Sequence, residues 1–421
     1  MKKAEARGFY SKTQGTGAVF EGIYLIDGKR TPFGKYTGSL STISPTDLGI
    51  QSSKAVLSET GIPATEIDQT LVANIGQASA DSFFLPRHIA LYSGAPLASP
   101  ALMVQRICGS GMELLACAAE QIALGKAKLI LGCGTDTMSR FPLVSFSARQ
   151  GFPLGKPQFV DMLWEALDDT AALPMGATAD RLAQRYQLTR EEVDFFAYTS
   201  QNRYFQAFEQ GFFKKEITPM ESGIFEREGL KPRKYRLNGV QKLDCDENPR
   251  QTTLEKLAKL PFVFSKEGPT TPGSASGIVD GACSALVADE EFIKTHGIKP
   301  IGKILAVSTV GVEPEMMGIG PAPAIRSALS ALKMGLRDID LFEINEAFGA
   351  QCFAVTKELE LDLDKLNIHG GAIAIGHPLA ATGVRLVTTC LKSLKMKNKK
   401  LGVVSACIGG GQGIAMVLEA V

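Results

Sequence analysis

Short apolar, β-branched runs alternate along the chain with stretches that have helical periodicity, a pattern that predicts an α/β architecture. Because the strand candidates are apolar almost throughout, we expect sheets that are buried on both faces. The predicted strands cover residues 22–26, 70–75, 101–107, 129–133, 301–309, 341–344, 366–369, 401–406 and 414–418.

The order of these elements repeats, which indicates a duplicated fold. Residues 68–76 are echoed by 338–345, and residues 129–134 by 401–409. The strand before Cys108 is echoed by the strand that ends near His369. Since α/β folds build their sites from loops at strand ends, the duplication predicts that Cys108, His377 and Cys407 meet.

Between residues 151 and 260 the pattern changes, and we expect an inserted, partly helical subdomain there. TREE at residues 189–192 is a capping box that predicts a helix continuing to Phe208. The basic run KPRKYR at residues 231–236 is either a solvated loop or a phosphate contact. The chain then divides into a tail at 1–20, a first half at 21–150 plus 261–295, the insertion, and a second half at 296–421.

Composition excludes several classes of protein. The 421 residues are 45% hydrophobic and 21% charged, as in soluble globular proteins. A net charge of +1 gives no global field for nucleic acid or an acidic membrane, and no apolar run reaches the length of a membrane span. The polar residues 1–20 lack the apolar core of a secretory signal, and Glu5 argues against a mitochondrial presequence. We therefore expect a cytoplasmic protein with a mobile N-terminal tail.

The eight cysteines show no zinc spacing, and the four histidines form no metal-binding pair, so we predict no metal site. In a chain this long without a signal peptide, the thiols are expected to be reduced. Most should be small core residues, and the question is which cysteines do chemistry.

Cys108 lies in RICGSG, at residues 106–111, between an apolar strand and a helix with apolar periodicity. The positive end of the helix dipole would favour a thiolate there. Gly109 and Gly111 would allow a sharp turn and the close approach of a substrate. The segment alone is equally consistent with a nucleophile and with a buried structural cysteine.

Three further motifs supply polar groups beside glycines. His377 lies in GGAIAIGHP at residues 370–378, and a histidine exchanges a proton with a thiol near neutral pH. Cys407 precedes GGGQG, whose free backbone N–H groups, beginning at Gly409, suit an oxyanion hole. A phosphate loop is the competing interpretation, but no G-K-[ST] follows. Asn345 in NEAF, at residues 345–348, could hold a water or donate to an oxyanion.

Together these four motifs, in their order and spacing, closely resemble the thiolase family over nearly the whole chain, from about residue 22 to 421. Secondary matches are PMGATAD (174–180), DENPR (246–250) and TPGSASG (271–277). The resemblance implies duplicated βαβαβαββ halves that form a layered α-β-α-β-α core with an inserted loop subdomain. It also implies a CoA-dependent acyltransferase that makes or cleaves 3-ketoacyl thioesters, with no permanently bound cofactor.

The resemblance further implies residue roles. Cys108 would be the acylated nucleophile. His377 would activate it and help to form the first oxyanion hole, together with a water held by Asn345. Cys407 would move the proton at the α-carbon of the acetyl unit. The backbone N–H groups of Cys108 and Gly409 would form the second oxyanion hole. The implied substrate and CoA contacts are Met175, Arg250, Ser276 and Ala347.

Some positions depart from the family pattern, but none of them removes a catalytic group, and the one at Pro174 leaves the acyl-chain preference open. Pro174 stands where short-chain members often carry histidine, and Ala380 replaces a usual glycine. The pair Ala380 and Ala381 resembles thiolase subunits of β-oxidation complexes. The resemblance implies a homodimer or homotetramer, with association with a β-oxidation hydratase/dehydrogenase subunit as a further expectation.

Three alternatives make different demands on the motifs. A decarboxylating ketosynthase-like enzyme often has histidine at the position of Asn345 and no cysteine at that of Cys407. A cysteine hydrolase would need only one cysteine, so Cys407 would have no catalytic role. A catalytically silent thiolase-like scaffold that binds CoA would not need the intact set of catalytic groups.

Overall fold

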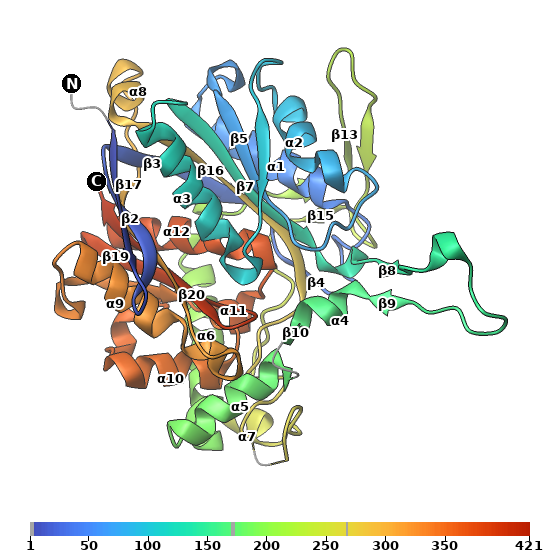
Figure 1. Ribbon diagram of the computed structural model, residues 1–421, viewed down its shortest axis with the longest axis vertical. Coiled ribbons are helices and arrows are strands. Elements are labelled where there is room, and N and C mark those ends of the chain that lie inside the picture. Colours follow the sequence, from blue (N-terminus) through green and yellow to red (C-terminus); the bar gives the residue numbers. More distant parts are fainter. Residues whose placement is uncertain (1–3, 170–172, 267) are drawn as a thin grey trace.

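A large mixed sheet runs through the protein, whose computed structural model describes residues 4–169, 173–266 and 268–421 (Figure 1). Its strands follow one another in the order β18 (Leu341–Ile344), β19 (Leu401–Ile408), β20 (Gln412–Ala420), β17 (Gly302–Gly311), β3 (Ile23–Arg30), β16 (Val279–Asp289), β7 (Leu129–Thr137), β5 (Gln69–Ala73) and β6 (Ala101–Val104). Strands β1 (Glu5–Ser11), β2 (Gly15–Glu21) and β4 (Gly34–Lys35) pair beside this path.

The two halves of the sheet have matching strand orders, and they join where β3 pairs with β17. In chain order the first half is β3, α1, β5, α2, β6, α3, β7 and β16, which is the predicted βαβαβαββ sequence. The second half follows the same course, except that its third strand is a single bridge between Phe342 and Leu366. The expected duplication is therefore visible in the topology.

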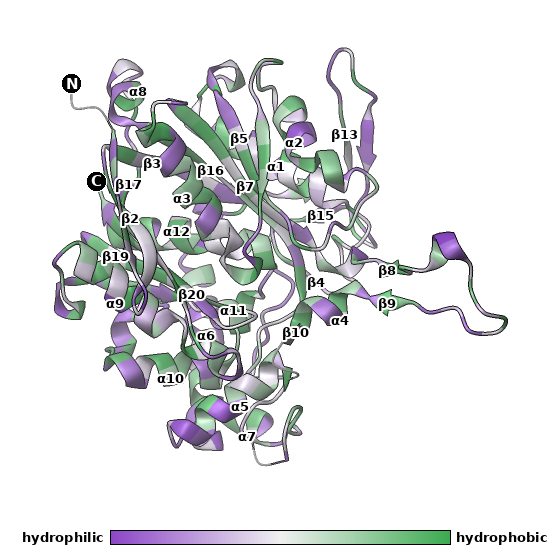
Figure 2. Cartoon of the chain, viewed as in Figure 1, coloured by the Kyte–Doolittle hydropathy of each residue, from purple (hydrophilic) through white to green (hydrophobic). Residues whose placement is uncertain are grey.

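Helices form three layers around these strands. Central α3 (Ser110–Ala123) and α12 (Leu379–Met396) share one apolar core with β7, β16, β19 and β20. Helices α1 (Pro45–Thr60) and α2 (Leu85–Ser93) pack on the first half, and α9 (Pro321–Ala331) and α10 (Gly349–Leu359) on the second. The result is the predicted α-β-α-β-α layering, and Figure 2 shows hydrophobic residues concentrated along its central strands.

The region between the halves is spread over both of them rather than forming one separate unit. Val193 packs with α10, whereas Leu237 packs with α1. A long arm carries β8 and β9 away from the body (Figure 1). The strands and α-helices of the whole region between the halves are β8 (Leu143–Val144), β9 (Val160–Asp161), α4 (Met162–Leu167), β10 (Asp168–Asp169), β11 (Leu173–Pro174), α5 (Met175–Arg185), α6 (Arg190–Glu209), β12 (Met220–Glu221), β13 (Gly223–Phe225), β14 (Arg233–Tyr235), β15 (Lys242–Leu243) and α7 (Leu254–Ala258).

The predicted helix of this region is confirmed as α6. Thr189 caps it, since its hydroxyl accepts from the Glu192 N–H at 3.2 Å while the Glu192 carboxylate accepts from the Thr189 N–H at 2.8 Å. Two short helices complete the described elements, α8 (Glu290–Thr295) and α11 (Ala372–Ile375).

Three sequence expectations differ from the structure. Most of the predicted tail at 1–20 forms the β1–β2 hairpin, because β2 pairs with β17 and buries Phe20. The strand predicted at 101–107 stops at Val104, because Ile107 has a positive φ of 42°. The strand predicted at 366–369 shrinks to one bridge, because the Asn367 side chain takes the place of strand pairing by bonding the N–H and C=O of Ile344.

Candidate active site

Cys108 lies in a single 3₁₀ turn, η3 (Ile107–Gly109), that leads directly into α3. The residue is buried, and burial raises the pKa of its thiol to about 11. Hydrogen bonds from the backbone N–H groups of Gly409 and of Cys108 itself act in the opposite direction, and Asp136 raises the pKa further. The thiolate expected from the helix dipole is therefore not the resting form, and the thiol needs a base.

His377 lies just before the second central helix, α12, and is followed by Pro378 at the N-cap of that helix. Burial lowers the pKa of its imidazole to about 3, and the positive charge of Arg385 adds to this, so the ring is neutral near pH 7. Its Nδ1 lies 2.6 Å from the hydroxyl oxygen of Thr382, whereas its Nε2 has no hydrogen-bond partner among the described residues.

Cys407 is the penultimate residue of β19 and is buried there, two residues before the glycine turn into β20. Burial, with a further contribution from Cys108, raises the pKa of this thiol well above its ordinary value. Gly411 adopts a φ of 88°, and a Cβ there would lie 2.6 Å from the Val312 carbonyl oxygen, so the tight turn requires glycine. Arg106 links this turn to the Cys108 turn, because its Nη1 lies 3.2 Å from the Gln412 Oε1.

The structure brings Cys108, His377 and Cys407 together on the wall of one cavity of about 340 Å³. Apolar side chains make up most of the remaining wall, so charge that develops inside is poorly screened by water. Most of these apolar residues lie outside the sequence motifs, because a single apolar side chain gives no distinctive pattern. They include Met138, Trp164, Leu167, Phe264, Met317 and Leu379.

Three predicted substrate contacts, Met175, Ser276 and Ala347, also line this cavity. The Ser276 N–H donates to the Ala347 carbonyl at 3.0 Å, and the Gly277 carbonyl accepts from the His377 N–H at 3.1 Å. The chain around Ser276 therefore joins the NEAF motif to the histidine motif.

Asn345 and Gly409 do not line the cavity, but each lies two residues from one that does, Ala347 and Cys407 respectively. Asn345 is fully buried at the end of β18, and neither atom of its side-chain amide has a hydrogen-bond partner among the described residues. A buried amide without partners is costly, which indicates that it binds something the protein alone does not supply. Gly409 faces Met175, whose terminal methyl would lie 2.3 Å from an added Cβ.

Arg250 is not on the catalytic cavity. It is exposed at a neighbouring pocket of about 230 Å³, which shares Ala275, Ser276 and Gly277 with the catalytic cavity. Lys256 is a second exposed cation on the same wall. No residue of the basic run at 231–236 lines either pocket, and its Arg233 forms ion pairs with Asp47 and Asp81.

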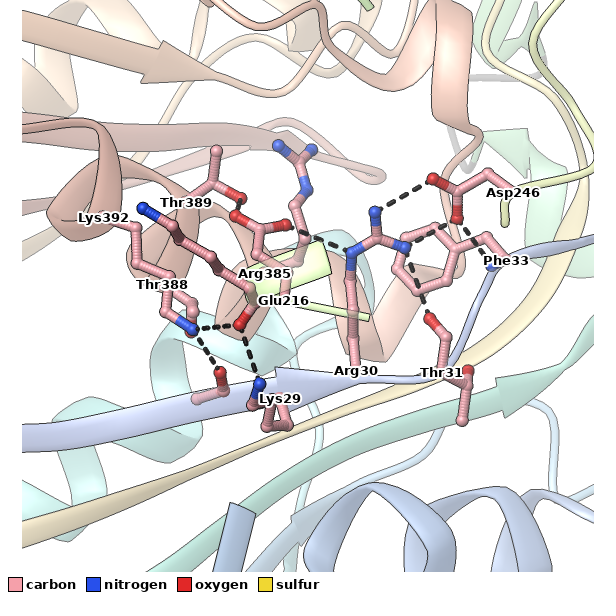
Figure 3. A network of polar contacts seen from close by, with 12 residues as sticks. Lys29, Arg30, Thr31, Phe33, Glu216, Asp246, Arg385, Thr388, Thr389 and Lys392 are labelled. Carbon is pink, nitrogen blue, oxygen red and sulfur yellow. Dashed lines mark hydrogen bonds and ion pairs between the residues drawn. The ribbon is translucent and has the colours of Figure 1, made fainter. Parts of the chain in front are cut away.

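A buried network of charges lies beneath α12 (Figure 3). Arg30 bonds both carboxylate oxygens of Asp246 at 2.6 and 2.9 Å, and its Nε bonds Glu216 at 3.3 Å. Glu216 in turn accepts from the Thr389 hydroxyl of α12 at 2.8 Å. Asn248, two residues after Asp246, donates to the carbonyl of Ala374 at 2.7 Å. The network thus fixes the 246–250 loop against the helix that follows His377.

Comparison with known proteins gives matches over nearly the whole chain. Residues 23–291 match the thiolase N-terminal domain, and residues 298–420 match the thiolase C-terminal domain. The mitochondrial 3-ketoacyl-CoA thiolase of Bos taurus is 41% identical over 405 residues, which cover 96% of this chain and 99% of the relative. An acetyl-CoA acetyltransferase of Allochromatium vinosum is 38% identical over 410 residues, with 95% and 99% covered.

Solved structures agree with these matches. The human mitochondrial 3-ketoacyl-CoA thiolase in complex with CoA superposes with a TM-score of 0.89 at 39% identity, covering 95% of this chain and 98% of that one. With family matches across both halves and this similarity over nearly its full length, the chain belongs to the thiolase family.

Proposed function

We propose that this thiolase catalyses the reversible CoA-dependent cleavage of a 3-ketoacyl-CoA through an acyl thioester on Cys108. The observation that carries the proposal is the meeting of Cys108, His377 and Cys407 on one small, buried, largely apolar cavity. Two cysteines and a neutral imidazole are the groups that thiolytic carbon–carbon cleavage needs: a nucleophile, its base and a second proton carrier.

In the first half-reaction His377 takes the proton of the Cys108 thiol as the sulfur attacks the 3-keto carbon. The sulfur–carbon bond forms, and the bond between C2 and C3 then breaks. Its electron pair stays on C2 of the departing acetyl-CoA, and Cys407 supplies the proton there. Because His377 is neutral near pH 7, it is in the form that accepts a proton.

Before the second half-reaction the proton held by His377 passes to the Cys407 thiolate, which restores both groups. His377 then takes the proton from the thiol of a new CoA as its sulfur attacks the acyl carbon. The bond from that carbon to Cys108 breaks, and His377 returns the proton to the Cys108 sulfur. The reverse direction is a Claisen condensation of an acyl-CoA with acetyl-CoA. Since the acyl group stays covalently bound to Cys108 after acetyl-CoA leaves and before the new CoA binds, we expect ping-pong kinetics.

Backbone N–H groups support the proposed oxyanion stabilisation. Those of Cys108 and Gly409 both donate to the Cys108 sulfur, so they converge on the atom that carries the acyl group. Each donor to a developing oxyanion contributes about 3 kcal/mol. For the first oxyanion we propose a water on Asn345, in keeping with its unpartnered, buried amide.

The paired pockets support a path for CoA. We propose that the pantetheine arm passes Ser276 and Ala347, since Ser276 lines both the catalytic cavity and its neighbour. The nucleotide end would then lie near Arg250 and Lys256, whose positive charges suit its phosphates.

The acyl chain has a second space available. Met175 lines both the catalytic cavity and a third cavity of about 700 Å³, which Ile107, Phe141 and Gly409 also border. We therefore propose that Met175 and Pro174 face the acyl chain, and that chains longer than acetoacetyl are accepted.

Thiolysis assays with acetoacetyl-CoA and a long-chain 3-ketoacyl-CoA test the proposal. The expected result is CoA-dependent cleavage of both, with the higher kcat/KM for the longer chain. Preference for acetoacetyl-CoA would contradict the chain-length proposal alone. Cleavage of neither would contradict the function and favour the silent CoA-binding scaffold.

The cellular location, the oligomeric state and the protein partners of the enzyme remain predictions. The sequence predicted a cytoplasmic location, whereas the bovine and human relatives are named as mitochondrial. In the described part of the chain, no helix is both long and apolar enough to cross a bilayer. A homodimer or homotetramer, and association with a hydratase/dehydrogenase subunit, are testable by sedimentation and by copurification.

A further inference from the structure

The side chain of His377 is held by a residue that no motif had singled out. Thr382 lies in the first turns of α12 and is fully buried, as His377 nearly is. Its hydroxyl oxygen is 2.6 Å from the His377 Nδ1 and 3.0 Å from the carbonyl oxygen of Pro378.

The usual hydrogen bond of a threonine hydroxyl within a helix indicates the roles in this contact. The threonine hydroxyl has one proton, and within a helix it characteristically donates that proton to the carbonyl four residues earlier, here Pro378. Its oxygen is then an acceptor toward His377, whose Nδ1 must carry the N–H. A neutral imidazole has only one N–H, so Nε2 bears the lone pair.

Nε2 of His377, which has no hydrogen-bond partner among the described residues, is the nitrogen that the reaction needs as a base. His377 borders the same cavity as Cys108. In water a neutral imidazole carries its proton mainly on Nε2, which would make that atom a donor instead of a base. An outside partner on Nδ1 reverses this preference.

We propose that Thr382 is a positioning residue that fixes His377 as the Nδ1–H tautomer, so that Nε2 is the proton acceptor of the catalytic cavity. The proposal rests on the proposed function, in which His377 takes the proton of Cys108. Thr382 acts through His377, and its loss removes the correct base without removing the imidazole.

The substitutions Thr382→Val and Thr382→Ser separate this role from packing. Valine keeps the shape of threonine but has no oxygen, whereas serine keeps the hydroxyl. We expect Thr382→Val to lower kcat of thiolysis by about 100-fold with KM for CoA nearly unchanged, and Thr382→Ser to stay close to wild type. Equal activity of the valine variant and wild type would overturn the proposal, as would equal losses in the two variants.

Nitrogen-15 NMR of the imidazoles reads the tautomer directly and does not depend on either variant. The chain has only four histidines, and a His377→Asn variant identifies the signals of His377. We expect the wild-type Nδ1 to be protonated and Nε2 to be unprotonated at pH 7. A protonated Nε2 in the wild type would overturn the proposal. If wild-type enzyme with this tautomer cleaved no 3-ketoacyl-CoA, the proposed function would fail while the assigned tautomer stood.

Discussion

Gly111 of α3 and Gly383 of α12 touch backbone to backbone. A Cβ on Gly383 would lie 2.8 Å from the Gly111 Cα and 2.3 Å from the Met112 nitrogen, and a Cβ on Gly111 would lie 2.8 Å from the Gly383 Cα. Because α3 follows Cys108 and α12 follows His377, this contact helps to set the separation of the two groups.

The substitution Gly383→Ala tests that relationship. Since its Cβ would meet backbone atoms, which cannot rotate away, we expect a loss of about 2 kcal/mol in the free energy of unfolding. We also expect kcat to fall more than KM rises. Gly311→Ala is the matched control, because nothing lies within 4 Å of its added Cβ. Urea unfolding and steady-state thiolysis measure both effects, and equal behaviour of the two variants would count against the account.

Replacing Cys407 by serine separates the two proposed half-reactions. Cys108 should still be acylated from acetyl-CoA, but condensation should fall by about 10³-fold, because the proton carrier at the α-carbon is lost. Hydrogen–deuterium exchange at the acetyl methyl should be lost as well. Cys352→Ser on α10 is the control, since that cysteine is buried but does not line the cavity. Failure of acylation in Cys407→Ser would show that the division of labour is wrong.

Arg30 holds the buried network of Figure 3 together. In Arg30→Ala both Asp246 and Glu216 would stay buried without their cation, and we expect a loss of about 3–5 kcal/mol in the free energy of unfolding. Arg337→Ala, at an exposed position, should change stability by less than about 0.5 kcal/mol. Chemical denaturation measures both, and a loss below about 1 kcal/mol for Arg30→Ala would indicate that the network contributes little.

His369 makes stability depend on pH. The ring stacks on Phe212 with centroids 3.8 Å apart, and burial, with the charge of Lys397, lowers its pKa from 6.5 to about 4. The unfolded state therefore binds more protons between pH 6.5 and 4, so stability falls as the pH is lowered through that window. At pH 4 this group alone costs roughly 3 kcal/mol.

The substitution His369→Phe keeps an aromatic ring but removes the titration. Between pH 6.5 and 4 its free energy of unfolding should fall by roughly 3 kcal/mol less than that of the wild type. Asp136, whose pKa burial raises to about 7, contributes with the opposite sign in both proteins and cancels from the difference. Parallel pH curves for the two proteins would contradict the assignment.

Local patterns were enough to predict much of this fold. The strands at 341–344 and 401–406 and the capped helix after Thr189 agree with β18, β19 and α6. Each has a strong signal within its own few residues, either an apolar run or a capping box. The motifs likewise allowed Cys108, His377 and Cys407 to be selected, and the structure places them on one cavity.

The features that could not be predicted from the sequence are mostly those that depend on partners far away in the chain. No local pattern predicted strand β16, which lies between β3 and β7 in the sheet, because these two partners are more than a hundred residues away in the chain. The residues of the β1–β2 hairpin have the composition of a polar tail, and their strand structure depends on the pairing of β2 with β17. Asp136 is another such case, because it accepts from the Ala380 N–H, 244 residues away. Thr382 is only five residues from His377, but no motif links a threonine at this spacing to an imidazole.

The central claim is that the acyl group is carried on Cys108. The most direct measurement is to mix the protein with acetyl-CoA, quench with acid, digest and locate the acetyl group by mass spectrometry. The account predicts one acetyl group on the peptide that contains Cys108, in the wild type and in Cys407→Ser, removed by added CoA and absent from Cys108→Ser. An acetyl group on Cys407, or undiminished thiolysis by Cys108→Ser, would contradict it.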